Sequence, residues 1–244
     1  SIPHYRVMSH VHPDKLQADD EYCLLPNFRL PQHIHSRSAN AKWLAEIAHR
    51  NPLWVHPSDA AKLKVGEGDL LKVETEIGWF IDKVWVTEGI KPGIVGCSHH
   101  IGRWRRKQDS GNRFMTNEVE IEDLGGGRMR MRTISGVRPW ESEDPDTNRV
   151  WWRDGGVHQN ITHAVQPDPI SGAHCWLQRV KISKPSEGER YGDVEVDTKK
   201  SFEYYKGWNE MAKERESHPR GERRPLWMNR PLPPRKEHWY LERS

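Results

Sequence analysis

Long apolar runs are missing from this chain of 244 residues. No stretch approaches the ~18 consecutive apolar residues that a membrane-spanning helix needs, so we expect no direct membrane span. No N-terminal segment has the charged-then-apolar layout of a signal peptide. Cysteine is scarce, and Cys23, Cys97 and Cys175 lie far apart without a CxxC pair. This argues against a disulfide framework and against a zinc or iron–sulfur site built from the chain's own thiolates.

A large excess of charge of one sign is also missing. The 38 basic and 35 acidic residues leave a net charge of +3, which is too balanced to indicate nucleic-acid binding. The sequence lacks GxGxxG, P-loop, HExxH and GxSxG motifs and contains no complete catalytic constellation. It begins with Ser1 rather than Met, which is expected of a fragment or a processed product.

The rest of the sequence divides into stretches of different composition. Residues 1–32 are punctuated by prolines and are expected to form an extended lead-in. Residues 33–183 are expected to form one barrel domain that carries a polar insert at 105–150, with a hairpin over 118–122 and 129–134. Residues 184–244 are basic and proline-rich and are expected to form an extended arm.

Local patterns within 33–183 favour short strands over long helices. Helical spacing predicts a helix over 41–48, and Ser58 is expected to cap a short helix over 59–63. Strands are expected at 53–55, 70–75, 80–86, 94–97 and 177–182, with turns at glycines between them. Short, closely spaced strands with few helices predict a mainly β fold, a β-barrel rather than a parallel α/β sheet.

Three polar clusters are candidates for chemistry. The first is HIHSRSAN, residues 33–40, just ahead of the predicted helix. The free N–H groups and positive dipole of a helix N-terminus suit an anion or a polar heterocycle. The alternative interpretation is an N-capped loop with solvated polar residues.

The second cluster is SHHIGRW, residues 98–104, directly after a predicted strand. Adjacent histidines diverge on an extended backbone, so hydrogen bonding at the strand end is the favoured role. The alternative is that His33 and His35 meet His99 and His100 in a zinc or copper site.

The third cluster runs from Asp154 to Gln178 and holds Gly155 and Gly156, followed by amide and imidazole side chains. Paired glycines allow unusual backbone angles and close approach of a ligand. The alternative is a Gly/Pro-rich loop whose polar groups satisfy their own backbone.

Together the clusters resemble a known family. The segments HIHSRSANAKWLAEI, NPLWVHPSDAAKLKVGEGDLLKVETEIG, VTEGIKPGIVGCSHHIGRW and DGGVHQNITHAVQPDPISGAHCW are similar to the C-terminal molybdopterin-dinucleotide-binding domain of the DMSO reductase superfamily of molybdenum and tungsten enzymes. The resemblance covers about residues 33–104 and 151–183. It implies a double-psi β-barrel of the aspartate-decarboxylase-like type, with short helices, a polar insert and a C-terminal arm.

The resemblance also implies a cofactor, bis-molybdopterin guanine dinucleotide with molybdenum or tungsten. Asn, Gln and neutral His match the alternating N–H and carbonyl groups of a pterin edge. The residues that it assigns to cofactor binding are His35, Ser36, Arg37, Ser38, Asn40, His99, Gly102, Trp104, Gly156, His158, Asn160, His174 and Gln178. No residue of this chain is assigned as a metal ligand or as catalytic.

Within the superfamily, the pattern HSRS…N…WL with NPLW is most similar to catalytic subunits acting on sulfur oxyanions or polysulfide, or on arsenic oxyanions. The expected partners are the remainder of such a catalytic subunit, which holds the iron–sulfur clusters, and an iron–sulfur electron-transfer subunit. The chain alone is expected to be inactive. The competing interpretation is a non-catalytic double-psi-barrel interaction module, because a fold does not fix a function.

Overall fold

The computed structural model describes residues 20–26, 42–47, 50–99, 102, 104–108, 117–136, 143, 145, 155–164, 176–210, 212–214 and 223–225. The elements, in chain order, are β1 (Glu21–Leu25), α2 (Lys42–Ile47), β2 (Leu53–Val55), α3 (Pro57–Leu63), β3 (Leu70–Glu74), β4 (Gly78–Val86), β5 (Ile94–Gly96), β6 (Trp104–Arg106), β7 (Asn117–Gly125), β8 (Arg128–Ser135), the 3-10 helix η2 (Gln159–Thr162), β9 (Gln178–Ser183), β10 (Val194–Asp197), α5 (Thr198–Glu210), β11 (Ala212–Glu214) and β12 (Arg223–Pro225). None of the helices in these described ranges is long and apolar enough to cross a bilayer.

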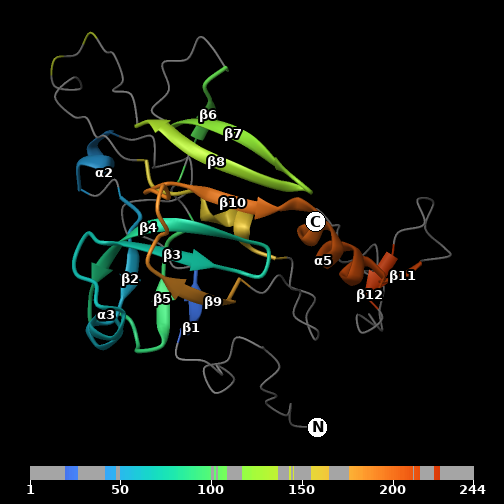
Figure 1. Cartoon of the computed structure of the whole chain (residues 1–244), viewed down its shortest axis with the longest axis horizontal. Helices are drawn as coiled ribbons and strands as arrows, with labels where there is room; N and C mark the ends of the chain where they lie inside the picture. The colour runs from blue at the N-terminus through green and yellow to red at the C-terminus, as the bar shows by residue number, and fades with distance from the viewer. Residues whose placement is uncertain are drawn as a thin grey trace, which may run out of the picture. The chain divides into compact units, whose positions relative to one another are not determined.

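Six strands close into a barrel in the order β2-β5-β1-β9-β3-β4 (Figure 1). The ring is completed by parallel pairing of β2 with β4, in which Leu53 lies opposite Val84 and Val55 opposite Val86. Its interior is filled by apolar side chains that are almost wholly removed from water, such as Leu24, Leu53, Leu71, Val73, Phe80 and Val95. The mainly β barrel with short helices is thereby confirmed, while the double-psi connection stays a prediction.

Strand β1 lies inside the stretch that we expected to be a lead-in. It pairs in parallel with β5, with Cys23 opposite Ile94, and antiparallel with β9. Three consecutive residues, Tyr22, Cys23 and Leu24, are buried, so both faces of the strand are covered. A strand buried on both faces shows no alternation of apolar and polar residues, which is why the period-2 pattern does not reveal it.

The start of α3 also differs from the prediction. The helix begins at Pro57, and its N-cap is His56 rather than Ser58. The His56 Nδ1 atom accepts a hydrogen bond from the Ser58 backbone N–H at 3.2 Å. Proline fits the first helical position because its fixed φ suits a helix and its missing N–H would have no helical partner there.

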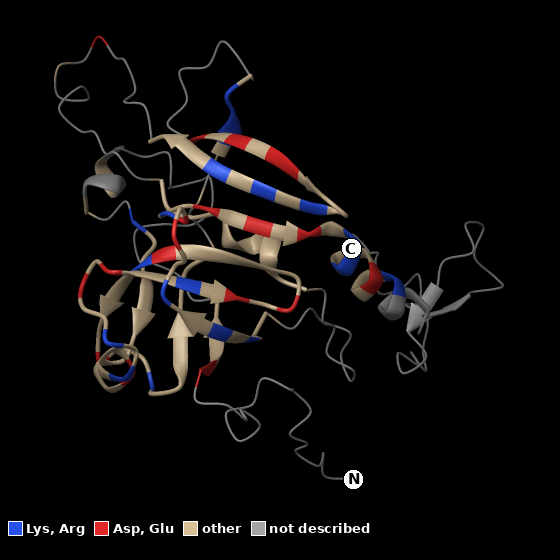
Figure 2. Cartoon of the chain, viewed as in Figure 1, with Lys and Arg blue, Asp and Glu red and all other residues tan. Residues whose placement is uncertain are grey.

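Four further strands extend the sheet beyond the barrel, in the order β4-β10-β8-β7-β6. The predicted hairpin is present as β7 and β8, longer than expected, and β10 of the predicted arm pairs with both β8 and β4. Arg128, Arg130 and Arg132 alternate along β8, where Arg130 lies opposite Glu122 of β7 and Glu195 of β10. Figure 2 shows basic residues alternating along β8, with acidic residues on the neighbouring β7 and β10.

Ion pairs across these strands link the hairpin to β10. Arg132 donates to both carboxylate oxygens of Asp193, from Nε at 3.0 Å to Oδ1 and 3.2 Å to Oδ2, and from Nη2 at 2.8 Å to Oδ2. Arg128 and Arg130 both donate to Glu195, which is buried. Hydrogen bonding to Asp193 is the main cause that raises the pKa of Arg132. The three arginines of β8 are therefore used within the sheet.

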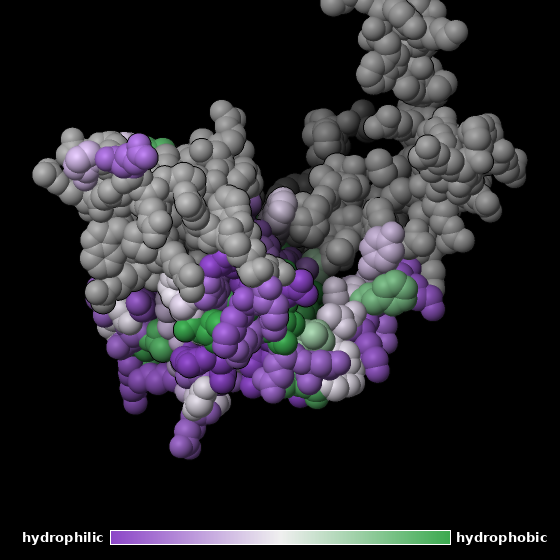
Figure 3. Space-filling view, turned by 90° about the horizontal axis from the view of Figure 1, so that it is seen from above, coloured by the Kyte–Doolittle hydropathy of each residue, from purple (hydrophilic) through white to green (hydrophobic). Residues whose placement is uncertain are grey.

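The chain divides into two compact units by its internal contacts. The first unit contains the barrel, the extended sheet and the start of α5. In the second unit, β11 and β12 pair antiparallel, with Lys213 opposite Arg224. On the face shown in Figure 3, the described residues are mainly hydrophilic with small separated hydrophobic areas, as a mean hydropathy of −0.92 leads one to expect.

Candidate functional site

The second and third polar clusters meet beside the barrel. The segment after β5, described at residues 97–99 and 102, is called the β5 segment below. Residues 155–162, which include η2, are called the glycine segment. Gly102 N–H donates to the Gly155 carbonyl at 2.8 Å, and Asn160 Nδ2 donates to the His99 carbonyl at 3.3 Å. Two stretches more than 50 residues apart in sequence thus form one polar surface.

Gly102 allows the two segments to approach this closely. Its φ is +105°, and a Cβ atom at this position would lie 2.1 Å from the Val157 carbonyl oxygen. Gly156 also has a positive φ, +79°, and its carbonyl accepts a hydrogen bond from Asn117 Nδ2 at 3.0 Å. Only glycine combines a left-handed backbone with an absent side chain, which explains why glycine is present at Gly102 and Gly156.

Two predicted histidines flank this junction. His99 Nδ1 lies 3.0 Å from the Pro26 carbonyl oxygen, and its ring stacks on Trp176 with centroids 5.3 Å apart. Because a carbonyl can only accept, Nδ1 of His99 carries the proton in this contact.

His158 packs edge-on against Trp104, with centroids 6.0 Å apart. Burial lowers the pKa of His158, and a backbone hydrogen bond with Gly102 opposes that shift only in part. The ring is therefore mainly neutral at pH 7, with one donor and one acceptor nitrogen.

Asn160 carries an unsatisfied acceptor. Its Oδ1 atom is buried and receives no hydrogen bond from the residues that the structure describes, although its Nδ2 is engaged with His99. A buried polar atom without a partner is rare and calls for an explanation, such as a bound ligand that donates an N–H.

The other predicted site residues lie partly in strands and partly outside the described residues. Trp104 is the first residue of β6, and Gln178 is the first residue of β9, where it is 1% exposed. The first cluster, with His35, Ser36, Arg37, Ser38 and Asn40, lies outside the described residues, as do His100 and His174. The structure thus brings together His99, Gly102, Trp104, Gly156, His158 and Asn160 from the predicted set.

Three amide side chains at this junction were not predicted. Asn51 and Gln159 hold the backbone of Ser98, and Asn117 holds that of Gly156. All three are buried. The signal in the sequence is slight: Asn51 precedes Pro52 ahead of a strand, and Gln159 lies between two residues that we did assign.

Cys97 precedes this junction and is fully buried. Burial is the largest cause that raises the pKa of its thiol, and the nearby Asp82 carboxylate adds to it, while a hydrogen bond with Gln159 acts in the opposite direction. A thiol of raised pKa is a poor nucleophile and a poor metal ligand, so Cys97 is a packing residue here.

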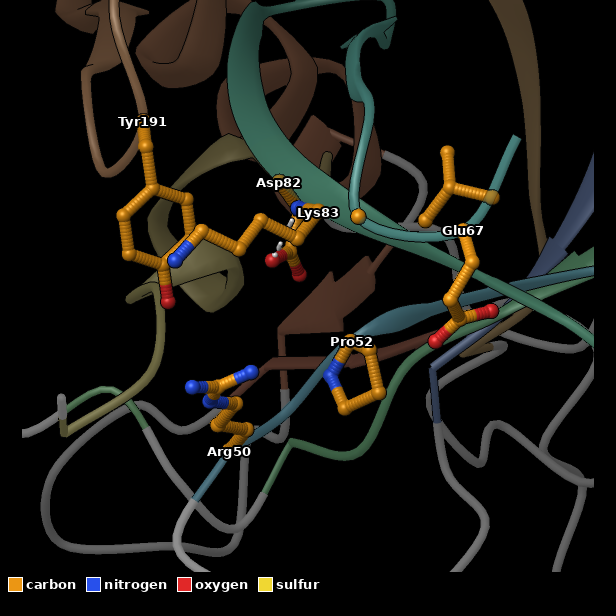
Figure 4. A pocket seen from close by; sticks show the side chains of 8 residues that line it. Arg50, Pro52, Glu67, Asp82, Lys83 and Tyr191 are labelled. Atoms are coloured by element: carbon orange, nitrogen blue, oxygen red, sulfur yellow. Dashed lines mark hydrogen bonds between the residues drawn. The ribbon is translucent and has the colours of Figure 1, made fainter. Parts of the chain in front are cut away.

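A small pocket lies elsewhere along β4, with a volume of about 90 Å³ (Figure 4). Arg50, Glu67, Asp82, Lys83 and Tyr191 contribute polar groups to its lining. Lys83 Nζ lies 4.4 Å from the centre of the Tyr191 ring, and the Lys83 N–H donates to Asp82 Oδ1 at 2.7 Å. A pocket of this size, with both signs of charge, does not fit a dinucleotide.

Comparison with known proteins gives a direct match for part of the chain. Residues 24–134 match the family described as "Molydopterin dinucleotide binding domain". The match runs from β1 to β8 and ends before the glycine segment.

Three curated proteins are similar to parts of this chain. A Halobacterium salinarum protein, named as the catalytic subunit of a dimethyl sulfoxide reductase, is 31% identical over 93 residues, which are 38% of this chain and 11% of that protein. ArrA, the molybdopterin-containing subunit of the arsenate respiratory reductase of Chrysiogenes arsenatis, is 31% identical over 111 residues, 42% of this chain and 12% of the relative. The trimethylamine-N-oxide reductase of Haemophilus influenzae is 30% identical over 79 residues, 32% of this chain and 9% of the relative.

This chain spans about a tenth of the length of the curated relatives that it matches. Among solved structures, acetylene hydratase from Pelobacter acetylenicus is similar with a TM-score of 0.46 and 16% identity, over 75% of this chain and 21% of that one.

Proposed function

We propose that this chain, whose residues 24–134 are a molybdopterin-dinucleotide-binding domain of the DMSO reductase family, holds the pterin cofactor of a larger molybdenum or tungsten oxidoreductase. The expected cofactor is bis-molybdopterin guanine dinucleotide. The proposed partners are the remainder of the catalytic subunit, together with an iron–sulfur electron-transfer subunit.

The single observation that carries the proposal is the unsatisfied Oδ1 atom of Asn160. It is buried at the junction of the β5 and glycine segments, where a ligand N–H would supply the missing hydrogen bond. A pterin edge offers such N–H groups beside carbonyl acceptors. The unsatisfied acceptor of Asn160 therefore fits a pterin N–H.

The chain's own residues would act by binding and orientation. Asn160 would accept from a pterin N–H, and the neutral ring of His158 would offer the nitrogen that its backbone hydrogen bond with Gly102 leaves available. Gly102 would keep the two segments packed together beside the ligand, because the Val157 carbonyl occupies the space that a Cβ atom would take. When bound, the cofactor supplies the redox chemistry, and the protein supplies position and electrostatics.

The reaction we propose is oxidation or reduction of a sulfur oxyanion or polysulfide, as the residues HSRS…N…WL with NPLW suggest. A second candidate substrate is an arsenic oxyanion, which the 31% identity to part of an arsenate respiratory reductase favours. The chain alone is proposed to be inactive, since its three cysteines are too few to ligate a cluster together with a metal.

Replacing Asn160 by alanine in the native complex tests the assignment. Losing one neutral hydrogen bond costs ~0.5–1.5 kcal/mol, so most of the metal should stay bound among many other contacts. We expect the midpoint potential of the metal to shift and turnover to fall, because the pterin loses a hydrogen bond that tunes its electronics. Redox titration and metal analysis measure both.

The control is Thr87→Ala, which removes a hydroxyl that accepts from Gly89 N–H in the turn after β4. If Asn160→Ala and Thr87→Ala give the same metal content, midpoint potential and turnover, Asn160 is not a cofactor contact and the interpretation of the third cluster as a self-satisfied loop stands.

A further inference from the structure

The backbone of Ser98 is held from two sides by buried amide side chains. Asn51 accepts from the Ser98 N–H at 2.7 Å through Oδ1, and its Nδ2 donates to the Ser98 carbonyl. Gln159 Nε2 donates to the same carbonyl at 2.7 Å. Asn51 and Gln159 are each 1% exposed, and Ser98 is fully buried. Both lone pairs of one carbonyl are thus occupied, and the peptide group has little freedom to rotate.

Ser98 and Gln159, which share one of these hydrogen bonds, are directly adjacent in sequence to the proposed cofactor contacts. Ser98 and His99 are consecutive, and so are Gln159 and Asn160. Gln159 donates to the first of the two carbonyls, and Asn160 donates to the second. A rotation of the Ser98 peptide would therefore move the His99 carbonyl, and with it the amide of Asn160 and its unsatisfied Oδ1 atom.

Asn51, which holds the Ser98 backbone, is itself attached to the barrel wall. Asn51 stands two residues before β2, which lies between β4 and β5 and closes the barrel. Pro52 fixes the backbone between Asn51 and the strand. Trp54 of β2 pairs with Gly96 of β5, only two residues before Ser98. The barrel wall is thus joined to the β5 segment by the sheet and again by the Asn51 side chain.

We propose that Asn51 and Gln159 are positioning residues that transmit the geometry of the barrel wall to Asn160 and His99. They would hold these two groups at the cofactor without touching the cofactor themselves. This inference rests on the proposed function. The competing explanation is that Asn51 is one more buried polar residue that stabilises the fold, with no particular effect on the site.

A matched control exists at the other end of β5. Asp59 is also 1% exposed, and its Oδ2 accepts from the Gly93 N–H at 2.7 Å, just ahead of β5. Asp59→Leu therefore removes a buried side-chain grip on a backbone N–H, as Asn51→Leu does. Asn51→Leu keeps the branched shape of the original side chain, is larger in volume and loses both hydrogen bonds. Asn51→Asp keeps the acceptor for the Ser98 N–H but turns a second acceptor toward the Ser98 carbonyl.

The first measurement is amide hydrogen exchange in the full chain. With Asn51→Leu we expect exchange of Ser98, His99, Gly102 and residues 158–161 to be about tenfold faster than the change in global stability explains, from the loss of two buried hydrogen bonds. In Asp59→Leu, the exchange rates of these amides should change only as much as the change in global stability explains. Should Asn51→Leu not fold, Gln159→Met removes one donor to the same carbonyl and should accelerate the same amides.

The second measurement is the midpoint potential of the metal in the native complex. Asn51→Leu should shift it in the same direction as Asn160→Ala, and the double variant should shift it no further than Asn160→Ala alone. Asn51→Asp should shift it as well, while Asp59→Leu should not. If Asn51→Leu and Asp59→Leu behave alike in exchange and in potential, the positioning role is wrong. If the native complex holds no pterin, the proposed function fails, and the exchange experiment still decides whether Asn51 and Gln159 order the two segments.

Discussion

Replacing Gly102 by alanine should separate the β5 and glycine segments and remove most of the bound cofactor. The new Cβ would lie 2.1 Å from the Val157 carbonyl oxygen and 2.6 Å from the His158 backbone nitrogen. Both are backbone atoms, so neither can move aside as the tip of a side chain would. The φ of +105° adds strain for any residue with a side chain. We expect a loss of ~2–5 kcal/mol in the free energy of unfolding, measured by urea denaturation of the chain.

Gly68→Ala is the matched control for this variant. Gly68 has a φ of +80°, but no atom lies within 4 Å of the position of its Cβ. It should therefore show the cost of a left-handed backbone alone, ~1–2 kcal/mol, and should keep the cofactor in the native complex. Equal cofactor retention in the two variants would mean that close contact at Gly102 is unimportant for the site.

The second large effect concerns the pair formed by Arg132 and Asp193. The Asp193 carboxylate is fully buried, and both of its oxygens accept hydrogen bonds from the Arg132 guanidinium. Arg132→Met would remove the main partner of this carboxylate, although the Arg190 N–H would still donate to it at 3.2 Å and Arg190 Nε would still lie 3.9 Å from its Oδ1. Removing one partner of a buried pair costs ~3–5 kcal/mol, and the remaining N–H should reduce this to ~2–4 kcal/mol.

A double-mutant cycle separates the effect of losing the ion pair from the effect of changing each residue alone. Arg132→Met with Asp193→Asn should lose less stability than Arg132→Met alone, because no unpaired charge remains. Lys107→Met is the control, since Lys107 pairs with Glu120 at 3.4 Å and both side chains are more than half exposed. Exposed pairs contribute ~0.2–1 kcal/mol at most. An Arg132→Met variant as stable as Lys107→Met would show that the ion pairs do not anchor the hairpin.

Local patterns predicted the successive elements of the barrel well. The alternation in LLKVE, the short helix expected over 59–63 and the glycine turns give β3, α3 and the start of β4 within a few residues, although the N-cap of α3 is His56 rather than Ser58. These features depend on neighbouring residues, which a single sequence displays. The closure of the barrel depends on pairing between distant strands, such as β1 with β9, and no local period encodes it.

The site was predictable in part, for the same reason. The glycines and imidazoles of the second and third clusters are conspicuous in the sequence, and the contact between Gly102 and Gly155 brings them together. Asn51 and Gln159 carry no motif, and their role depends on where Ser98 lies in space. In the same way, RMRMR predicts a strand, but the acidic partners of its arginines come from β10 and the residue before it, more than 60 residues away.

The most direct test of the account is the cofactor content of the native complex that contains this chain. Acid release followed by pterin fluorescence and nucleotide chromatography, with metal analysis of the same sample, measures it. We predict a fluorescent pterin and a guanine nucleotide released together, with molybdenum or tungsten present in proportion to the chain. A pure, intact complex with neither pterin nor either metal would contradict the account and leave a non-catalytic barrel module as its replacement.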